Sequence, residues 1–373
     1  MREAVLALTS DLVAIDSTSG TPGEAEVLRL VAAAFAGRPE AHVAVERSAD
    51  GEPVALLVTP TGLDPRVPLL LFSAHADVVP VGDPGAWSSP PFEACLVGDR
   101  LVGRGTSDMK SGLAAAVVAL HDLLPTGAAV ALAVSTGEEV GCLGAPAVAS
   151  LLEGWTVGAV VVPESTDGEV VLGHRGALWL TVATSGRAAH GSTPERGHNA
   201  VLDMVAVLGR IDGLPLGAHP ELGAETVNVG VVRGGTVPNV VPDRCEVRVD
   251  HRVARGDVGE LVAWWRDQPE VTEVTVDLDL AAVWTRRDHP WPSGLGAPVS
   301  ARPASYFTDA SVLVRSLPDD VPIVVWGPGD PTAVHTVDES VPVEAVVTAA
   351  LRFRDLGATW AAGAAQEDAH RVL

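Results

Sequence analysis

Lysine is almost absent from this chain. Of its 25 lysine and arginine residues all but one, Lys110, are arginine, and 48 acidic residues bring the formal net charge to -23. A nucleic-acid partner is disfavoured by this charge, because binding to phosphates needs a surplus of basic side chains. The same charge argues against an anionic membrane surface as a partner.

Cysteine and long apolar runs are also scarce. Three scattered cysteines are too few for a disulfide framework, and no Cys-x-x-Cys pair offers a thiolate zinc site. The longest apolar stretches, such as Leu113 to Leu120, are far too short to span a bilayer. The first residues show no signal-peptide pattern. We therefore expect a soluble, cytoplasmic protein with no membrane partner.

The length of 373 residues exceeds the size at which a single core usually keeps growing, so two domains are expected. In residues 1–173, apolar runs typical of buried strands alternate with helical spacing of apolar residues, which predicts an α/β domain. The expected strands are 54–59, 68–73, 128–135 and 157–162, and the expected helices are 4–16, 23–36 and 112–124.

The middle of the chain, residues 174–284, follows the order strand, helix, strand, strand, helix, strand. This βαββαβ order is that of a ferredoxin-like α+β sandwich. The α/β pattern then resumes, so we predict a mixed-sheet α/β catalytic domain (1–173 and 285–373) with a ferredoxin-like insertion at 174–284. In the last part we expect helices at 309–317 and 342–356, a strand at 321–326, and an Ala-rich tail after 358 that frays.

Five short segments each place a histidine or an acidic residue at the end of an apolar run. The carboxyl ends of the strands are where α/β sheets bind ligands. Two imidazoles and several carboxylates gathered there suit a pair of divalent metal ions, which can together activate a water and polarise a carbonyl. The sequence therefore predicts a metal-dependent hydrolase. The candidate residues are His75, Asp77, Asp108, Glu138, Glu139, Glu164 and His335.

The adjacent Glu138 and Glu139 give the clearest signal within this set. Neighbouring residues after a strand point to different sides, so one can bind metal while the other contacts the water. Crowded carboxylates raise the pKa of one member, which suits a general base. Asp77 lies two residues after His75, and it could orient the imidazole or polarise the site.

Structural roles are open for the other members. Asp108 could simply cap the helix that follows it. Glu164 follows a proline and is a weaker signal, and His335 lies in a polar loop where it could be an ordinary surface histidine.

The segments around these residues resemble the M20 metallopeptidase family from about residue 8 to residue 356. The resemblance implies two divalent metal ions, zinc in the first place, with cobalt or manganese as alternatives. It also implies that His75 and Glu164 bind one ion, that Glu139 and His335 bind the other, and that Asp108 bridges them. The segments are SAHADVVP, GRGTSDMKSG, STGEEVG, VVPEST, GRAAHGSTPERGHNA, GGTVPNVVPD and GPGDPTAVHTVDE.

Further roles follow from the same resemblance. Glu138 is expected to be the general acid and base, with Asp77 as the partner of His75. The insertion is expected to act as a lid and to mediate homodimerisation, and its His190 to donate a hydrogen bond to the oxyanion in a neighbouring active site. From the residues alone, His190 could instead structure its Gly/Ser loop.

Two positions of the insertion, Asn239 and Arg252, match residues that hold the substrate carboxylate in the family. Arginine suits this task because its planar fork binds a carboxylate through two hydrogen bonds. Arg252 could also form a salt bridge at a strand end.

The expected activity is hydrolysis of an N-acyl-L-amino acid, with an acetylornithine-type deacetylase of amino-acid biosynthesis as the first candidate. Glu164 and the GPG…H…DE stretch around His335 resemble that type. The alternatives are a succinyl-diaminopimelate desuccinylase, a small carboxypeptidase or dipeptidase, or, more remotely, a non-catalytic binding relative. Residues 306–311 depart from these types, and there Asp309 either caps a helix or meets a cationic substrate group.

Overall fold

The computed structural model describes the backbone of residues 1–371 and the side chains of residues 1–360. The chain forms two compact units. Unit 1 contains Met1–Gly173, Trp284–Ala304 and the chain from Thr308 onward, and unit 2 contains His174–Val283 and Ser305–Phe307. Residues 305–307 thus belong with unit 2, although the chain on both sides of them belongs to unit 1.

Unit 1 is built on a six-stranded mixed sheet with the strand order β1-β2-β6-β3-β7-β16. The four strands β6, β3, β7 and β16 run parallel to one another, and β2 is antiparallel to both of its neighbours, β1 and β6. Every residue of β3 and β6 is buried, as expected for parallel strands covered on both faces. The strands are β1 (Ala41–Arg47), β2 (Pro53–Pro60), β3 (Leu69–His75), β6 (Val130–Ser135), β7 (Val157–Val162) and β16 (Ile323–Val325).

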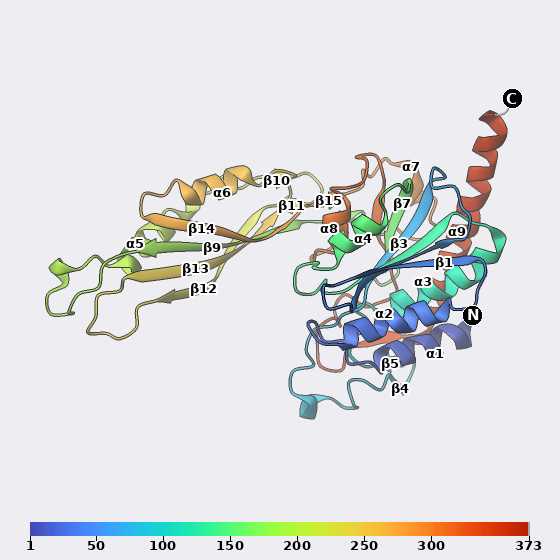
Figure 1. Ribbon diagram of the computed structural model, residues 1–373, viewed down its shortest axis with the longest axis horizontal. Helices are drawn as coiled ribbons and strands as arrows, with labels where there is room; N and C mark the ends of the chain where they lie inside the picture. The colour runs from blue at the N-terminus through green and yellow to red at the C-terminus, as the bar shows by residue number, and fades with distance from the viewer. Residues whose placement is uncertain (372–373) are drawn as a thin grey trace. The chain divides into compact units, whose positions relative to one another are not determined.

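Helices cover both faces of this sheet, and Figure 1 shows α1, α2 and α3 along one face with α4 on the other. Both α1 and α9 pack against α3, whose residues are almost all buried. The first residue of α3, Lys110, is itself buried, and its Nζ donates to the Ile15 carbonyl at 2.8 Å. The helices are α1 (Arg2–Val13), α2 (Gly23–Ala34), α3 (Lys110–Leu123), α4 (Ala145–Leu151), α7 (Pro290–Ser293), α8 (Ala310–Leu313) and α9 (Val343–Arg371).

A small second sheet in unit 1 has the order β17-β5-β4. It consists of β4 (Cys95–Val97), β5 (Arg100–Val102) and β17 (Ser340–Pro342), and Ser340 pairs with Val102. This ladder brings the chain after His335 beside the chain that leads to Asp108.

Unit 2 has the predicted ferredoxin-like architecture. Its four-stranded antiparallel sheet has the order β12-β13-β9-β14. Buried apolar residues of both helices and of the strands β9 and β13 form its core, among them Leu180, Met204, Val247 and Trp265. The elements are β9 (Gly176–Ser185), α5 (Ala200–Leu208), β12 (Thr226–Gly234), β13 (Arg244–Val253), α6 (Gly259–Arg266) and β14 (Val271–Leu280), with short strands β8 (Gly173–His174), β10 (Ala218–His219), β11 (Gly223–Ala224) and β15 (Val283–Trp284).

The last part of the chain differs from expectation in the lengths of its helices. The helix expected at 309–317 is regular only in α8 and then continues as turns. The closing helix expected at 342–356 is longer, since α9 extends through Arg371, and fraying of the tail stays a prediction. Alanine, which dominates this stretch, has the highest helix propensity. None of the helices in the described part of the chain is long and apolar enough to cross a membrane.

Candidate metal centre

Three neighbouring parallel strands of unit 1 deliver acidic and imidazole side chains to one edge of the sheet. His75 is the last residue of β3, Glu138 and Glu139 follow β6, and Glu164 follows β7. Gly137, with φ +67°, makes the left-handed turn that separates β6 from the two glutamates. Asp108 precedes Met109, the N-cap residue of α3, and the peptide bond between the two is cis.

The five residues predicted as metal ligands lie together around Asp108. His75 Nε2 is 3.0 Å from Glu164 Oε1 and 3.2 Å from Asp108 Oδ1. His335 Nε2 is 3.1 Å from Glu139 Oε1 and 3.2 Å from Asp108 Oδ2. Each oxygen of Asp108 therefore faces one imidazole, and each imidazole also faces one glutamate.

This donor set fits a pair of divalent ions. Imidazole nitrogens and carboxylate oxygens bind zinc at about 2.0–2.2 Å, so ligands of one tetrahedral ion lie about 3.3 Å from one another. The nitrogen–oxygen separations of 3.0 to 3.2 Å are close to that spacing. Asp108 does not cap α3, whose N-cap residue is Met109 without a side-chain cap, so its carboxylate is available to bridge two ions.

The contacts also shift the pKa values of the three central groups. Hydrogen bonds to Asp108 and Glu139 raise the pKa of His335 to about 10. Burial alone would lower the pKa of His75, but hydrogen bonds to Asp108, Asp77 and Glu164 hold it well above its usual value. Burial opposes ionisation of Asp108, yet its hydrogen bonds to the two imidazoles keep its pKa far below the usual range.

Glu138 has different surroundings from Glu139. It is buried, and its Oε1 accepts a hydrogen bond from the Cys142 thiol at 3.9 Å. Burial raises the pKa of Glu138 well above its usual value, and the nearby charges of Glu139 and Asp309 raise it further. A raised pKa favours the neutral form of the carboxyl group, which suits a group that accepts a proton and later returns it.

Asp77 contacts both His75 and the glutamate pair. His75 Nδ1 is 3.0 Å from the main-chain oxygen of Asp77 and 3.5 Å from its carboxylate. The carboxylate accepts the backbone N–H groups of Glu138 and Glu139 at 3.0 and 3.1 Å and the Ser19 hydroxyl at 2.8 Å. Sequence reasoning missed this second contact, which fixes the turn that carries the glutamate pair.

Asp309 occupies the N-cap position of α8, as the sequence predicted, but its side chain makes no capping hydrogen bond. The N–H of Ala310 donates instead to the Thr308 hydroxyl. The carboxylate of Asp309 is buried and accepts a hydrogen bond from Ser135. Burial raises its pKa to about 6. It is 4% exposed, and its charge contributes to the raised pKa of Glu138. A contact of Asp309 with a cationic substrate group stays a prediction.

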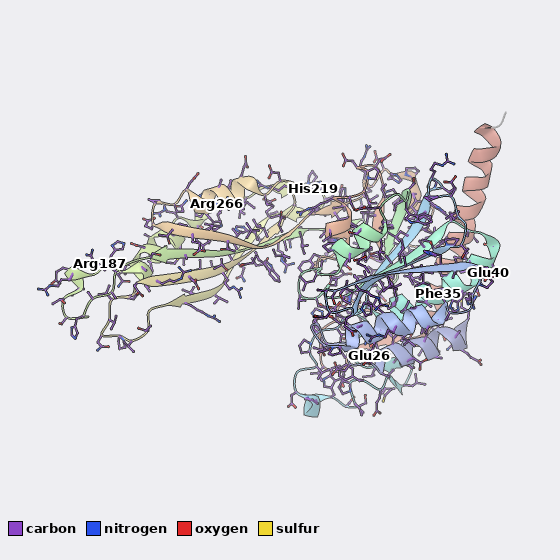
Figure 2. All side chains as sticks on the ribbon, viewed as in Figure 1. Glu26, Phe35, Glu40, Arg187, His219 and Arg266 are labelled. Atoms are coloured by element: carbon purple, nitrogen blue, oxygen red, sulfur yellow. The ribbon has the colours of Figure 1, made fainter. Side chains whose placement is uncertain are left out.

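The remaining predicted residues belong to unit 2. His190 is exposed, and its Nδ1 lies 2.7 Å from Ser192 Oγ. It follows shortly after Arg187, which Figure 2 labels. Asn239 is also exposed, and its main-chain oxygen accepts the N–H of the residue after His190 at 2.7 Å. These two predicted residues are therefore neighbours.

Arg252 lies apart from them on β13. Its Nε is 3.1 Å from Asp250, and its guanidinium carbon is 5.5 Å from the centre of the Phe307 ring. The salt-bridge role considered for Arg252 is therefore present, and its contact with a substrate stays a prediction.

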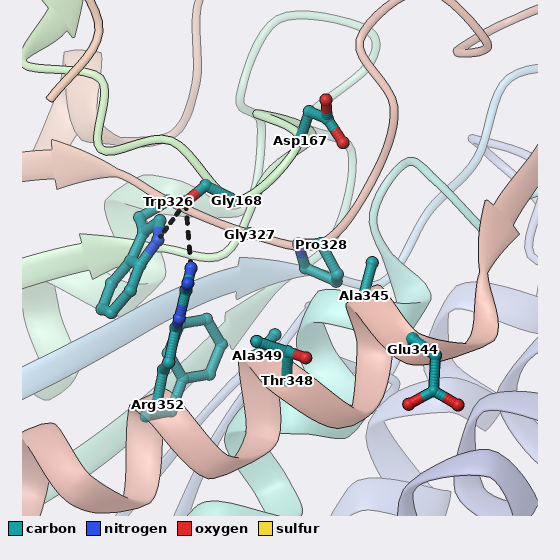
Figure 3. Close-up of a pocket in the computed structure, with 11 residues that line it drawn as sticks. Asp167, Gly168, Trp326, Gly327, Pro328, Glu344, Ala345, Thr348, Ala349 and Arg352 are labelled. Carbon is teal, nitrogen blue, oxygen red and sulfur yellow. Dashed lines mark hydrogen bonds between the residues drawn. The ribbon is translucent and has the colours of Figure 1, made fainter. Parts of the chain in front are cut away.

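Unit 1 also contains a cavity of about 250 Å³ beside the first turns of α9 (Figure 3). At its wall, Trp326 Nε1 and Arg352 Nη1 both donate to the Gly168 carbonyl, at 3.0 and 3.3 Å. None of the described residues that line it is a predicted ligand or catalytic residue, so this cavity is separate from the candidate metal centre.

Comparison with known proteins gives consistent relatives. Residues 172–267 match the peptidase dimerisation domain of the M20 family. Over 91% of this chain and 94% of the relative, the sequence is 30% identical to a succinyl-diaminopimelate desuccinylase of Cereibacter sphaeroides. It is also 29% identical to a probable succinyl-diaminopimelate desuccinylase of Staphylococcus epidermidis over 74% of this chain and 79% of that one.

The fold is also found in solved structures. An M20 family metallo-carboxypeptidase of Sulfolobus solfataricus superimposes with a TM-score of 0.76 at 17% identity, covering 95% of this chain and 99% of that one. At this identity the similarity concerns the fold alone.

Proposed function

The chain belongs to the M20 family of metallopeptidases and deacylases, and from this premise we propose that it is a two-metal enzyme that removes the acyl group from an N-acyl amino acid. Hydrolysis of an amide bond is the reaction class of the relatives. The observation that carries the proposal is the placement of Asp108, with one carboxylate oxygen toward His75 and Glu164 and the other toward His335 and Glu139.

Each residue has a defined part in the proposed reaction. When bound, the two ions supply Lewis acidity, which polarises the acyl carbonyl and makes a water more acidic. Glu138 accepts the proton of the attacking water and returns it to the leaving amine. Asp77 holds the backbone of Glu138 in place. His190 is proposed to donate a hydrogen bond to the oxyanion, and Asn239 and Arg252 to hold the substrate carboxylate.

The proposal also concerns the identity of the acyl group that the enzyme removes. The sequence alone favoured the activity of an acetylornithine-type deacetylase, but the two relatives named above are a succinyl-diaminopimelate desuccinylase and a probable one. We therefore put an N-succinyl amino acid first and an N-acetyl amino acid second. We propose zinc as the metal ion at both positions. The matched dimerisation domain supports a homodimer formed through unit 2. A cytoplasmic location is part of the same proposal.

Metal analysis and a substrate panel test these statements. The purified chain is expected to hold two zinc equivalents and to hydrolyse N-succinyl-diaminopimelate with a higher kcat/KM than N-acetylornithine or dipeptides. A higher kcat/KM for N-acetylornithine would instead favour an N-acetyl amino acid as the substrate. A chain that binds no divalent metal and hydrolyses none of these compounds would refute the function itself.

A further inference from the structure

A buried ion pair in unit 1 joins the two loops that carry Asp108 and His335. Arg104 and Glu339 are 2% and 0% exposed, and Arg104 Nη1 lies 2.6 Å from Glu339 Oε2. The two residues are 235 positions apart in the sequence. Arg104 shortly precedes Asp108 and Glu339 shortly follows His335, so the ion pair connects the two loops near both proposed ligands.

Glu339 also fixes the backbone on which Asp108 is carried. Its Oε1 accepts the N–H of Ser107 at 2.8 Å and the N–H of Asp108 at 2.9 Å. Its main-chain oxygen accepts the N–H of Gly103 at 2.8 Å and the hydroxyl of Thr106 at 3.2 Å. The loop from 103 to 108 is thus bonded to this one residue along its length, and it cannot shift independently of Glu339.

His335 depends on the same anchor. Its side chain is 48% exposed, so packing does little to hold the imidazole. After Glu339 the chain enters the β17–β5 ladder, where Ser340 pairs with Val102. The ladder and the contacts of Glu339 thus hold the chain that follows His335 beside the chain that leads to Asp108.

From these contacts we propose that Glu339 is a positioning residue, which holds Asp108 and His335 at the spacing that a shared metal ion requires. The inference rests on the proposed two-metal function and concerns a residue that is not itself a ligand. Loss of a group that orients metal ligands typically weakens metal binding by about 10–100-fold. Loss of one partner of any buried ion pair also destabilises the fold, so the test must separate stability from metal affinity.

Unit 2 offers a matched control in Glu225. Its carboxylate accepts the N–H groups of Gly217 and Ala254 at 2.7 and 2.9 Å and pairs with Arg255 at 2.5 Å. It is 5% exposed. Glu225 thus makes the same kinds of contact as Glu339, but it belongs to unit 2, whereas every proposed metal ligand belongs to unit 1.

The experiment titrates Zn²⁺ alone into the full chain and its E339A and E225A variants, in competition with a chromogenic chelator. Unfolding temperatures are measured on the same samples. We expect both variants to lose stability, E339A to bind zinc at least about tenfold more weakly, and E225A to bind it with native affinity. Native affinity in folded E339A, or an equal loss of affinity in E225A, would overturn the proposal.

A second variant covers the case in which E339A does not fold. E339Q keeps the size of the side chain and an acceptor oxygen but loses the charge that strengthens the bonds to Ser107, Asp108 and Arg104. It is expected to bind zinc about threefold more weakly or worse and to change the visible absorption of the Co²⁺-loaded protein. A native affinity and spectrum would refute the inference. Failure of the unmodified chain to bind zinc would instead refute the proposed function, and this inference with it.

Discussion

At the scale of single residues, the pair Glu138–Glu139 shows how neighbours in sequence acquire separate chemistry. Glu139 is hydrogen-bonded to His335 at 3.1 Å. Glu138 is buried and has no ion-pair partner among the side chains that the structure describes, and its backbone N–H donates to Asp77. The first arrangement suits a ligand, whose charge is stabilised by its partner. The second suits a proton carrier, since burial makes the neutral form of Glu138 accessible.

The substitution Glu138→Gln tests this division. Glutamine has nearly the same shape but cannot carry the proton, so kcat should fall by about 10²–10⁴-fold or more. Zinc content and unfolding temperature should remain close to those of the native chain. They are measured by metal analysis and by calorimetry. A fully active Glu138→Gln enzyme would remove the general-base assignment.

Proton release on metal binding is the second prediction at this scale. The pKa of His335 is raised to about 10, so its imidazole is protonated at pH 7.5 and must lose its proton to bind a metal ion. Zinc affinity should therefore fall as pH decreases. Because the folded pKa exceeds the usual 6.5, the ion pairs of His335 stabilise the metal-free fold fully below pH 6.5 and lose this effect as pH rises toward 10.

Titration calorimetry measures this release directly. Zinc is added in two buffers of equal pH whose ionisation enthalpies differ. We expect the apparent heats to differ by an amount equivalent to about one proton for each protonated imidazole. Equal heats in the two buffers would contradict the raised pKa.

At the scale of elements, the close packing of α3 on the end of β7 joins two ligand-bearing segments. A Cβ atom at Gly112 would lie 1.9 Å from the carbonyl oxygen of Pro163, the residue before Glu164. Only glycine allows this approach. The first turn of α3, which follows Asp108, is thereby fixed against the chain that carries Glu164.

Gly112→Ala is therefore expected to destabilise the protein, although Gly→Ala in an exposed helix stabilises by about 0.5–1 kcal/mol. The overpacking cost should be about 1–3 kcal/mol in the free energy of unfolding, measured by urea denaturation. Zinc affinity should fall as well, because Asp108 and Glu164 are forced apart. The control is Gly256→Ala, where a Cβ meets nothing within 4 Å; it should change stability by less than about 0.5 kcal/mol. An unchanged stability in Gly112→Ala would show that α3 can shift at no cost.

The elements differ in how well the sequence predicted them. The apolar runs of β3, β6 and β7 predicted these strands because both of their faces are buried. The edge strand β1 was missed, since its residues are only partly buried and give no apolar run. The short β4 and β5 were missed for a similar reason: three residues are too few to show a period.

The parts of the candidate site that follow buried strands could be inferred from the sequence pattern. His75 and Glu164 stand at the ends of apolar runs, whereas the roles of Asp108 and His335, which lie in loops, were implied by the family resemblance. The contacts of Asp309 and Glu339 could not be inferred, because their partners Ser135 and Ser107 lie 174 and 232 residues away. No local pattern encodes such contacts, which arise only when the sheet and its loops assemble.

At the scale of the whole molecule, unit 2 presents apolar side chains on its surface. Leu202 and Val205 of α5 are 64% and 60% exposed. Exposed apolar residues on a domain that matches a dimerisation family are expected to be covered by a second copy.

The double variant Leu202→Glu, Val205→Glu should therefore be monomeric. Burying like charges against their symmetry mates is unfavourable by several kcal/mol, so the dimer should dissociate at concentrations where the native chain is dimeric. Light scattering after size exclusion measures the mass of each. A native chain that is monomeric, or a variant that remains dimeric, would contradict this interface.

The burial of the sole lysine has a practical consequence for covalent chemistry. With Lys110 enclosed beneath Ile15, the folded molecule exposes no side-chain amine within its described residues, so acylating dyes and aldehyde fixatives have no such anchoring point there. Reaction at Lys110 requires the start of α3 to open. Its rate of modification would thus report, at one defined position, how often the interior next to Asp108 becomes accessible.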